Sequence, residues 1–103
     1  MTQTEVDGPL FLVVTIRPRL DKLSEAQAQL KSMIANNLKE EGCLSMHLVE
    51  SDDDEPGTWT MLEHFASRAA WDEHMASEHN LRGNELLDPL LREPSTLRLY
   101  REK

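Results

Sequence analysis

The sequence CLSMHLVE at residues 43–50, followed by DDDEPG at 52–57 and TWTMLEHF at 58–65, decides the fold of this chain. Both outer stretches carry apolar residues at odd and even positions, as strands do when each face of their sheet is covered. The acidic stretch between them, with its Pro-Gly pair, is typical of a turn. We therefore expect an antiparallel hairpin over residues 43–65.

Helical patterns lie on both sides of this hairpin. Over residues 22–40, apolar side chains recur at steps of three and four, and Ser24 and Gln27 have the spacing of a capping box. After the hairpin, Ser67 is a candidate N-cap for a second helical region, which Pro89 is expected to kink or end. The hairpin is thus expected to connect two helical segments.

Strands at the two ends complete the pattern. LFLVVTIR at residues 10–17 is rich in β-branched and aromatic residues, and TLRLY at 96–100 alternates between apolar and polar residues. The order β-α-β-β-α-β predicts a ferredoxin-like α+β fold with an antiparallel sheet. A chain of 103 residues suits one domain, expected at residues 10–103 after a flexible tail at 1–9.

The predicted sheet has one face that this chain does not cover. Right-handed crossovers place both helical regions on the same face, yet the strands are apolar on both faces. An uncovered apolar sheet of roughly several hundred Å² exceeds the usual patch on a soluble monomer. We therefore expect a homodimer in which two copies pair these faces.

Composition excludes several classes of partner. The net charge of −8 argues against binding to nucleic acid and to anionic membranes. The longest apolar run, at residues 10–14, is far shorter than the ~20 residues that span a bilayer, and residues 1–9 lack the pattern of a signal peptide. Because Cys43 is the only cysteine, no intrachain disulfide can form, and a cytoplasmic location is expected.

Residues 41–44 (EGCL), 58–63 (TWTMLE) and 67–79 (SRAAWDEHMASEH) resemble the antibiotic biosynthesis monooxygenase family, and the resemblance covers residues 10–100. It implies a dimeric α+β barrel with a pocket between sheet and helices in each subunit. It also implies oxygenation of quinols, anthrones and related phenols without metal or flavin. Phe65 replaces a frequent Trp, no Asn occurs in the first strand, and His74 stands where the haem-degrading branch carries Trp, so haem degradation is disfavoured.

Two residues are candidates for acid–base chemistry. His74 shares a helical stripe with Trp71 and Met75, and an imidazole with a pKa near ~6.5 can deprotonate a phenol at neutral pH. Glu63 has apolar neighbours on its face of the predicted strand, so its carboxylate needs a role or a partner. It can orient His74, bind a substrate hydroxyl, or pair with Arg98 or Arg17. A purely structural His74 is the alternative.

Several other side chains are candidates for the wall of a substrate pocket, and the same residue types also form ordinary cores. The candidates are Trp71, Phe65, Trp59, Met75, His47 and His79.

A metal site is not expected from the histidine spacing. His74 and His79 are five residues apart, which on one continuous helix separates them by about 140°. Metal-binding pairs on a helix need a four-residue step. We therefore predict no metal site, and the family resemblance implies that no cofactor is needed.

The predicted function is a cofactor-independent monooxygenase that acts on a small quinol-like or polyphenolic substrate. An electron-rich phenolate can reduce dioxygen directly, so a base and a dry pocket suffice. Two alternatives remain at this point. One is a non-catalytic dimeric barrel that binds a small hydrophobic molecule in a stress response, and the other is a cofactor-free isomerase.

Overall fold

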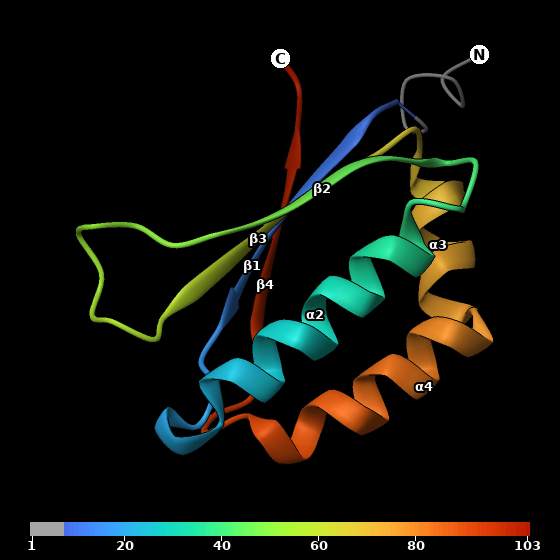
Figure 1. Cartoon of the computed structure of the whole chain (residues 1–103). Coiled ribbons are helices and arrows are strands. Elements are labelled where there is room, and N and C mark those ends of the chain that lie inside the picture. Colours follow the sequence, from blue (N-terminus) through green and yellow to red (C-terminus); the bar gives the residue numbers. More distant parts are fainter. Residues whose placement is uncertain (1–7) are drawn as a thin grey trace.

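Four antiparallel strands pair in the order β2-β3-β1-β4 (Figure 1). Their bounds are β1 Leu10–Ile16, β2 Cys43–Val49, β3 Trp59–Phe65 and β4 Thr96–Arg101. The computed structural model describes residues 8–103, so most of the expected tail at 1–9 lies outside the described residues. The predicted hairpin is confirmed, with a register shift between Cys43 and Ser45.

All helices lie on one side of the sheet (Figure 1). They are α2 (Leu23–Asn37), α3 (Arg68–Ala76) and α4 (Glu78–Leu87), with short 3-10 helices η1 (Leu20–Lys22) and η2 (Asp88–Leu90). The strand order with both crossovers on one face is the ferredoxin-like α+β arrangement predicted from the sequence. No helix in the described part of the chain is long and apolar enough to span a membrane.

The predicted capping box at the start of α2 is wrong. The N-cap is Lys22, which makes no side-chain cap bond. The 3-10 turn of η1 leads directly into the helix, and the Lys22 amide already donates to the Arg19 carbonyl at 2.9 Å. Ser24 therefore lies inside the helix, where its hydroxyl has no first-turn amide to cap.

The second helical region is two helices. Ser67 caps α3 as predicted, with its hydroxyl accepting from the Ala70 amide at 3.0 Å. Ser77 then adopts an extended conformation (φ −70°, ψ 147°) and accepts from the Asn80 amide at 3.3 Å, which starts α4. Pro89 lies in η2, just after α4 ends. The break at Ser77 changes the direction of the chain between His74 and His79.

The core lies between the sheet and the helices. Alternate residues of β1 and β3 point into it and are almost completely buried, and they pack against Ala26 and Leu30 of α2. These buried strand residues are Leu10, Leu12, Ile16, Trp59, Met61 and Phe65. No helix formed by the described residues lies over the opposite sheet face, and β4 is exposed along its whole length.

Candidate active site

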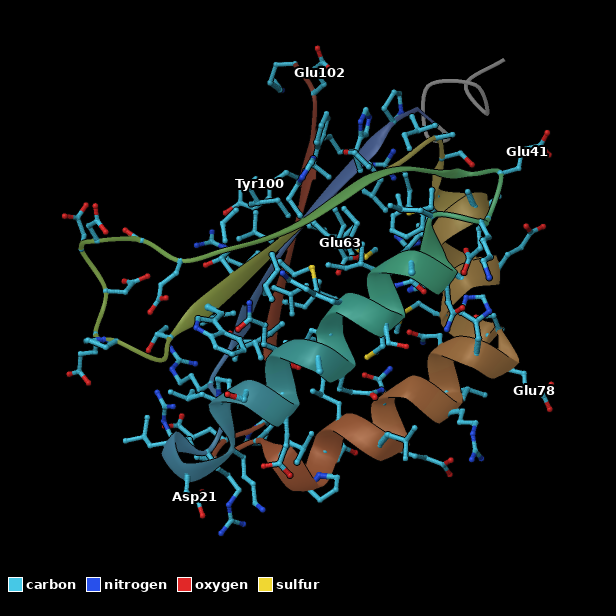
Figure 2. All side chains as sticks on the ribbon, in the orientation of Figure 1. Asp21, Glu41, Glu63, Glu78, Tyr100 and Glu102 are labelled. Atoms are coloured by element: carbon cyan, nitrogen blue, oxygen red, sulfur yellow. The ribbon has the colours of Figure 1, made fainter. Side chains whose placement is uncertain are left out.

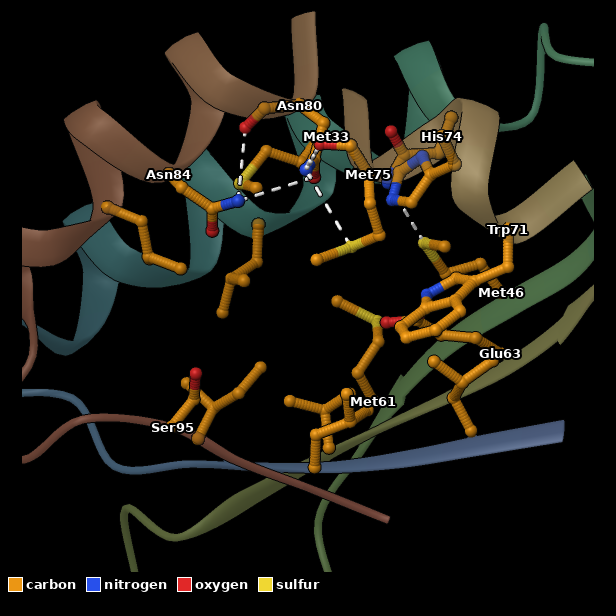
Figure 3. A pocket seen from close by; sticks show the side chains of 17 residues that line it. Met33, Met46, Met61, Glu63, Trp71, His74, Met75, Asn80, Asn84 and Ser95 are labelled. Atoms are coloured by element: carbon orange, nitrogen blue, oxygen red, sulfur yellow. Dashed lines mark hydrogen bonds between the residues drawn. The ribbon is translucent and has the colours of Figure 1, made fainter. Parts of the chain in front are cut away.

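A cavity of about 220 Å³ lies between the sheet and the helices (Figure 3). Its lining is mostly apolar and comes from the sheet, all three α-helices and the segment before β4. The lining residues are Leu12, Val14, Ile16, Leu30, Met33, Asn37, Met46, Met61, Glu63, Trp71, His74, Met75, Asn80, Asn84, Leu87, Ser95 and Leu97. An apolar cavity with a few polar groups is the usual form of a small-molecule site.

Among residues 8–103, Glu63 is the one carboxylate in the lining of this cavity. Other acidic residues, such as Asp21 and Glu41, project from the periphery, whereas Glu63 lies between the sheet and the helices (Figure 2). Burial raises the pKa of Glu63 from 4.5 to about 7. Near neutral pH the group therefore exists in both protonation states, and it can either accept or donate a proton.

Glu63 has no hydrogen-bond or ion-pair partner within residues 8–103, so the expected pairing with Arg98 or Arg17 does not occur there. Arg98 instead lies over the ring of Tyr100, 5.6 Å from its centroid. A buried carboxyl without a protein partner is costly for folding. Its position on the cavity wall leaves it available to a ligand.

Trp71 brings a second polar group without a partner. Its indole Nε1 is buried and has no acceptor in the described part of the protein, and the side chain lines the cavity. The Arg68 guanidinium lies over the ring, 5.0 Å from the centroid. A buried N–H donor without an acceptor is unfavourable.

His74 is buried on α3 and is held by a carboxylate, but not by Glu63. Its Nδ1 lies 2.9 Å from Oε2 of Glu40, in the turn after α2. The Phe65 ring packs against the imidazole with 5.1 Å between ring centroids. In the neutral imidazole, a proton on Nδ1 that is donated to the Glu40 carboxylate leaves the lone pair on Nε2. Glu40 thus provides the orienting contact that the sequence analysis considered for Glu63.

Gly42 allows the turn that carries Glu40 to lie close to α3. A Cβ at Gly42 would be 2.4 Å from the Ala70 Cβ, a distance that side-chain atoms cannot adopt. The Gly42 carbonyl also accepts from the Ala66 amide at 2.8 Å. This close approach places Glu40 within reach of His74 across 34 residues of sequence.

Of the candidate site residues, Glu63, Trp71, His74 and Met75 line the cavity. Four other candidates do not line it. Phe65 is fully buried behind His74, and Trp59 packs near Gln27 and Lys31 at another part of the sheet. His47 is exposed on the uncovered sheet face, where its neighbour is Leu62 of β3.

His79 is the fourth of these candidates, and it lies beyond His74 from the cavity. Its Nε2 is 2.5 Å from the same Glu40 oxygen that His74 contacts. The expected separation of about 140° applies only to residues on one continuous helix. Because the chain breaks at Ser77, the two imidazoles belong to different helices and converge on one carboxylate.

Sequence reasoning missed most of the polar and thioether lining. Asn80 and Asn84 are four residues apart, so they share one face of α4, and this spacing was a signal that could have been used. Met33, Met46 and Met61 complete, with Met75, a set of four methionines in the cavity wall. Methionine packs adaptably, so these walls can adjust to ligands of different shape.

Cys43 is not a nucleophile in this arrangement. Burial, together with the negative charges of Glu40 and Glu63, raises the pKa of its thiol from 9.0 to about 11. The thiol therefore stays protonated at neutral pH, as expected for a small buried core residue.

Comparison with known proteins agrees with this geometry. Residues 9–86 match the family model described as antibiotic biosynthesis monooxygenase. The chain is 36% identical over 87 residues to the "Putative monooxygenase Rv0793" of Mycobacterium tuberculosis (strain ATCC 25618 / H37Rv), with 84% of each chain covered. The solved structure of Rv0793 superposes with a TM-score of 0.85, covering 93% of this chain and 96% of that one at 32% identity.

A conserved protein from Methanosarcina mazei Go1 gives a TM-score of 0.87 at 27% identity, with 98% of this chain and 99% of that chain covered. The family model spans well over half of the sequence, and the relative from M. tuberculosis covers more than two thirds of it. This chain belongs to the antibiotic biosynthesis monooxygenase family.

Proposed function

We propose that this protein is a cofactor-independent monooxygenase for a small quinol-like aromatic substrate. The observation that carries the proposal is the cavity itself, which joins three polar groups in an apolar enclosure. They are the unpartnered Glu63 carboxyl, the unpartnered Trp71 N–H, and the His74 imidazole with a carboxylate on its far nitrogen. Family membership supports the same class of reaction.

The first step is removal of a phenolic proton. His74 accepts it at Nε2, and the resulting imidazolium is stabilised because Nδ1–H donates to Glu40. The Trp71 N–H has no protein acceptor, and a small movement of its buried ring would let it donate to the phenolate oxygen. These contacts favour the ionised substrate, which is the form that reduces dioxygen.

The second step is oxygenation. The phenolate transfers one electron to dioxygen, and the two radicals recombine to form a carbon–oxygen bond in a substrate peroxide. The His74 imidazolium returns its proton to the peroxide, and protonated Glu63 donates to the outer oxygen as the O–O bond breaks, so that this oxygen leaves as water. His74 removes the hydrogen of the oxygenated ring carbon as a proton, and that carbon keeps the other oxygen as a carbonyl. A hydroquinone thereby becomes a hydroxylated quinone, and the four electrons that dioxygen accepts come entirely from the substrate.

Cavity size restricts the substrate. A dry cavity of about 150 Å³ holds one benzene ring, so about 220 Å³ fits a substituted single ring or a small bicyclic quinol. Exposed side chains in the lining, Met75 at 45% and Leu97 at 43%, place the opening between α3 and β4. A substrate can enter there with its hydroxyl directed at Glu63 and Trp71.

Dioxygen uptake tests the proposal directly. Purified, chelator-treated protein is incubated with one-ring and two-ring quinols, and with anthrone as a larger ring system, against a heat-denatured control. We expect saturable uptake with the smaller quinols that persists in the presence of chelator. Absence of enzyme-dependent uptake across the panel, combined with saturable ligand binding, would instead identify a non-catalytic binding protein.

The proposal includes a homodimer joined through the uncovered sheet faces. Leu62, Val49 and Tyr100 are 41%, 41% and 42% exposed there in a single chain. On the same face, His64 stacks on Phe11 with 4.2 Å between centroids, and its buried Nε2 has no partner in the described residues. A second copy would cover the apolar residues and can supply the missing hydrogen-bond partner.

Sedimentation velocity at micromolar concentration measures this association. We expect one species of twice the chain mass, and Leu62→Lys is expected to shift it toward the monomer because a charge would be buried in the interface. Leu81→Lys is the matched control, since Leu81 is 56% exposed on α4, away from the sheet face. A monomeric wild-type chain would refute the dimer.

A further inference from the structure

Glu40, His74 and His79 form a triad that adjoins the cavity, in which His74 is the proposed base, Glu40 orients it and His79 has no role. We propose that these three residues form a binding site for a divalent transition-metal ion, with Zn²⁺ as the expected ion. Two imidazole nitrogens and one carboxylate oxygen are a donor set typical of zinc sites that keep a position open.

The geometry of the three donor atoms fits an ion of this size. The Glu40 Oε2 atom is 2.9 Å from His74 Nδ1 and 2.5 Å from His79 Nε2, and all three donor atoms lie within 4.8 Å of one another. In a tetrahedral zinc site with bonds of 2.0–2.1 Å, ligand atoms are separated by about 3.3 Å. Small side-chain rotations suffice to reach this spacing from the observed positions.

The three ligands come from separate parts of the fold. Glu40 follows α2, His74 is on α3, and His79 is in the first turn of α4. Their side chains are 20%, 5% and 36% exposed, so the triad is open on the His79 side and closed on the His74 side. An ion can enter from solvent and keep water in its remaining position.

The surroundings attract a cation. A surface hollow beside the triad is lined by Glu41 and Glu73 as well as by Glu40 and His79. Neither Glu41 nor Glu73 pairs with a basic side chain within residues 8–103. Together with the net charge of −8, these carboxylates raise the local concentration of divalent ions.

Metal binding would change which nitrogen of the His74 imidazole carries the proton. An ion on Nδ1 replaces the hydrogen bond to Glu40 and moves the imidazole proton to Nε2, the nitrogen that acts as the base in the proposed function. The metal-bound protein would therefore lack its base, and Zn²⁺ would act as an inhibitor. This consequence rests on the proposed function, whereas the binding site itself does not.

Calorimetric titration of chelator-treated full-length protein with ZnCl₂ tests the site without any substrate. We expect one Zn²⁺ per chain. Glu40→Gln and His79→Ala are expected to weaken binding by at least about tenfold. Glu55→Gln and His47→Ala, the matched controls outside both the triad and the hollow, are expected to leave it unchanged. Circular dichroism checks that each variant is folded.

Two results would overturn the site. One is the absence of saturable binding to the wild-type chain, and the other is an affinity that is equal in the triad variants and their controls. X-ray absorption at the zinc edge adds a direct readout, for which we expect two imidazole nitrogens and at least one oxygen around the ion. Because none of these measurements uses a quinol, failure of the metal site and failure of the oxygenase proposal are separate outcomes.

Discussion

His74→Gln is expected to lower kcat for quinol oxidation by about 10²–10⁴, the usual contribution of a positioned general base. A glutamine side chain is polar and of similar size. Its amide can still donate to Glu40 in place of the His74 Nδ1, which lies 2.9 Å from the carboxylate. The substituted side chain has no basic nitrogen to accept the phenolic proton. KM is expected to change little, because the apolar walls that hold the ring are retained. Oxygen-electrode kinetics give both constants.

The specificity of this result depends on two comparisons. His47→Ala removes an exposed imidazole that does not line the cavity, and its kcat is expected to equal that of the wild-type protein. Raising the pH is expected to restore part of the His74→Gln activity, since more substrate is then ionised in solution. A variant with wild-type kcat would remove His74 from the mechanism.

Glu63→Gln is expected to stabilise the folded protein by about 3 kcal/mol at pH 8 and to leave its stability almost unchanged at pH 4. Burial raises the pKa of Glu63 from 4.5 to about 7, so the folded state binds its proton more tightly than the unfolded state does. Below pH 4.5 Glu63 is protonated in both the folded and the unfolded state, so burying it lowers the free energy of unfolding only a little. Between pH 4.5 and 7 the unfolded chain ionises first, so stability falls as pH rises through this window. Above pH 7 the full cost of burying the charge is present.

Urea unfolding at pH 4, 6 and 8, at one protein concentration, measures this difference. The control is Glu55→Gln in the exposed loop between β2 and β3, for which we expect no pH-dependent gain. An equal free-energy difference between wild type and Glu63→Gln at pH 4 and at pH 8 would contradict the assignment. The same variant is expected to lose oxygenation, because an amide cannot protonate the peroxide. Opposite effects on stability and activity are typical of functional residues in strained environments.

The fold could be predicted because each element has a strong local pattern. The β-branched run at residues 10–17 has the length and composition of a strand, and the apolar stripe of α2 has the length and spacing of a helix. The capping box failed because the chain enters α2 through a 3-10 turn, which no side-chain pattern in residues 20–22 indicated. The break at Ser77 had a signal in the sequence, because Ser77 stands three residues before Asn80, the spacing of an N-cap and the amide that it accepts from. The helical spacing of Trp71 and Met75 instead favoured one continuous helical region.

The site was predictable only in part. Glu63 and His74 were found because an acid among apolar neighbours and a histidine on an apolar stripe are local anomalies. Glu40 could not be found in this way. It lies 34 residues from His74, and nothing in the sequence around it distinguishes it from an ordinary acidic residue after a helix. Its role depends on the close packing of Gly42 against Ala70, which is a property of the tertiary structure.

The four methionines of the cavity wall would limit how long the proposed oxygenase stays active. Thioethers are oxidised to sulfoxides by reduced oxygen species. Superoxide or peroxide released in the cavity would form next to Met33, Met46, Met61 and Met75. A sulfoxide is polar and bulkier, so each oxidation makes the wall less suited to an aromatic ring. The same side chains that would let the cavity adapt to a substrate would therefore be oxidised gradually during turnover. Sustained activity of the proposed oxygenase in a cell would depend on methionine sulfoxide repair.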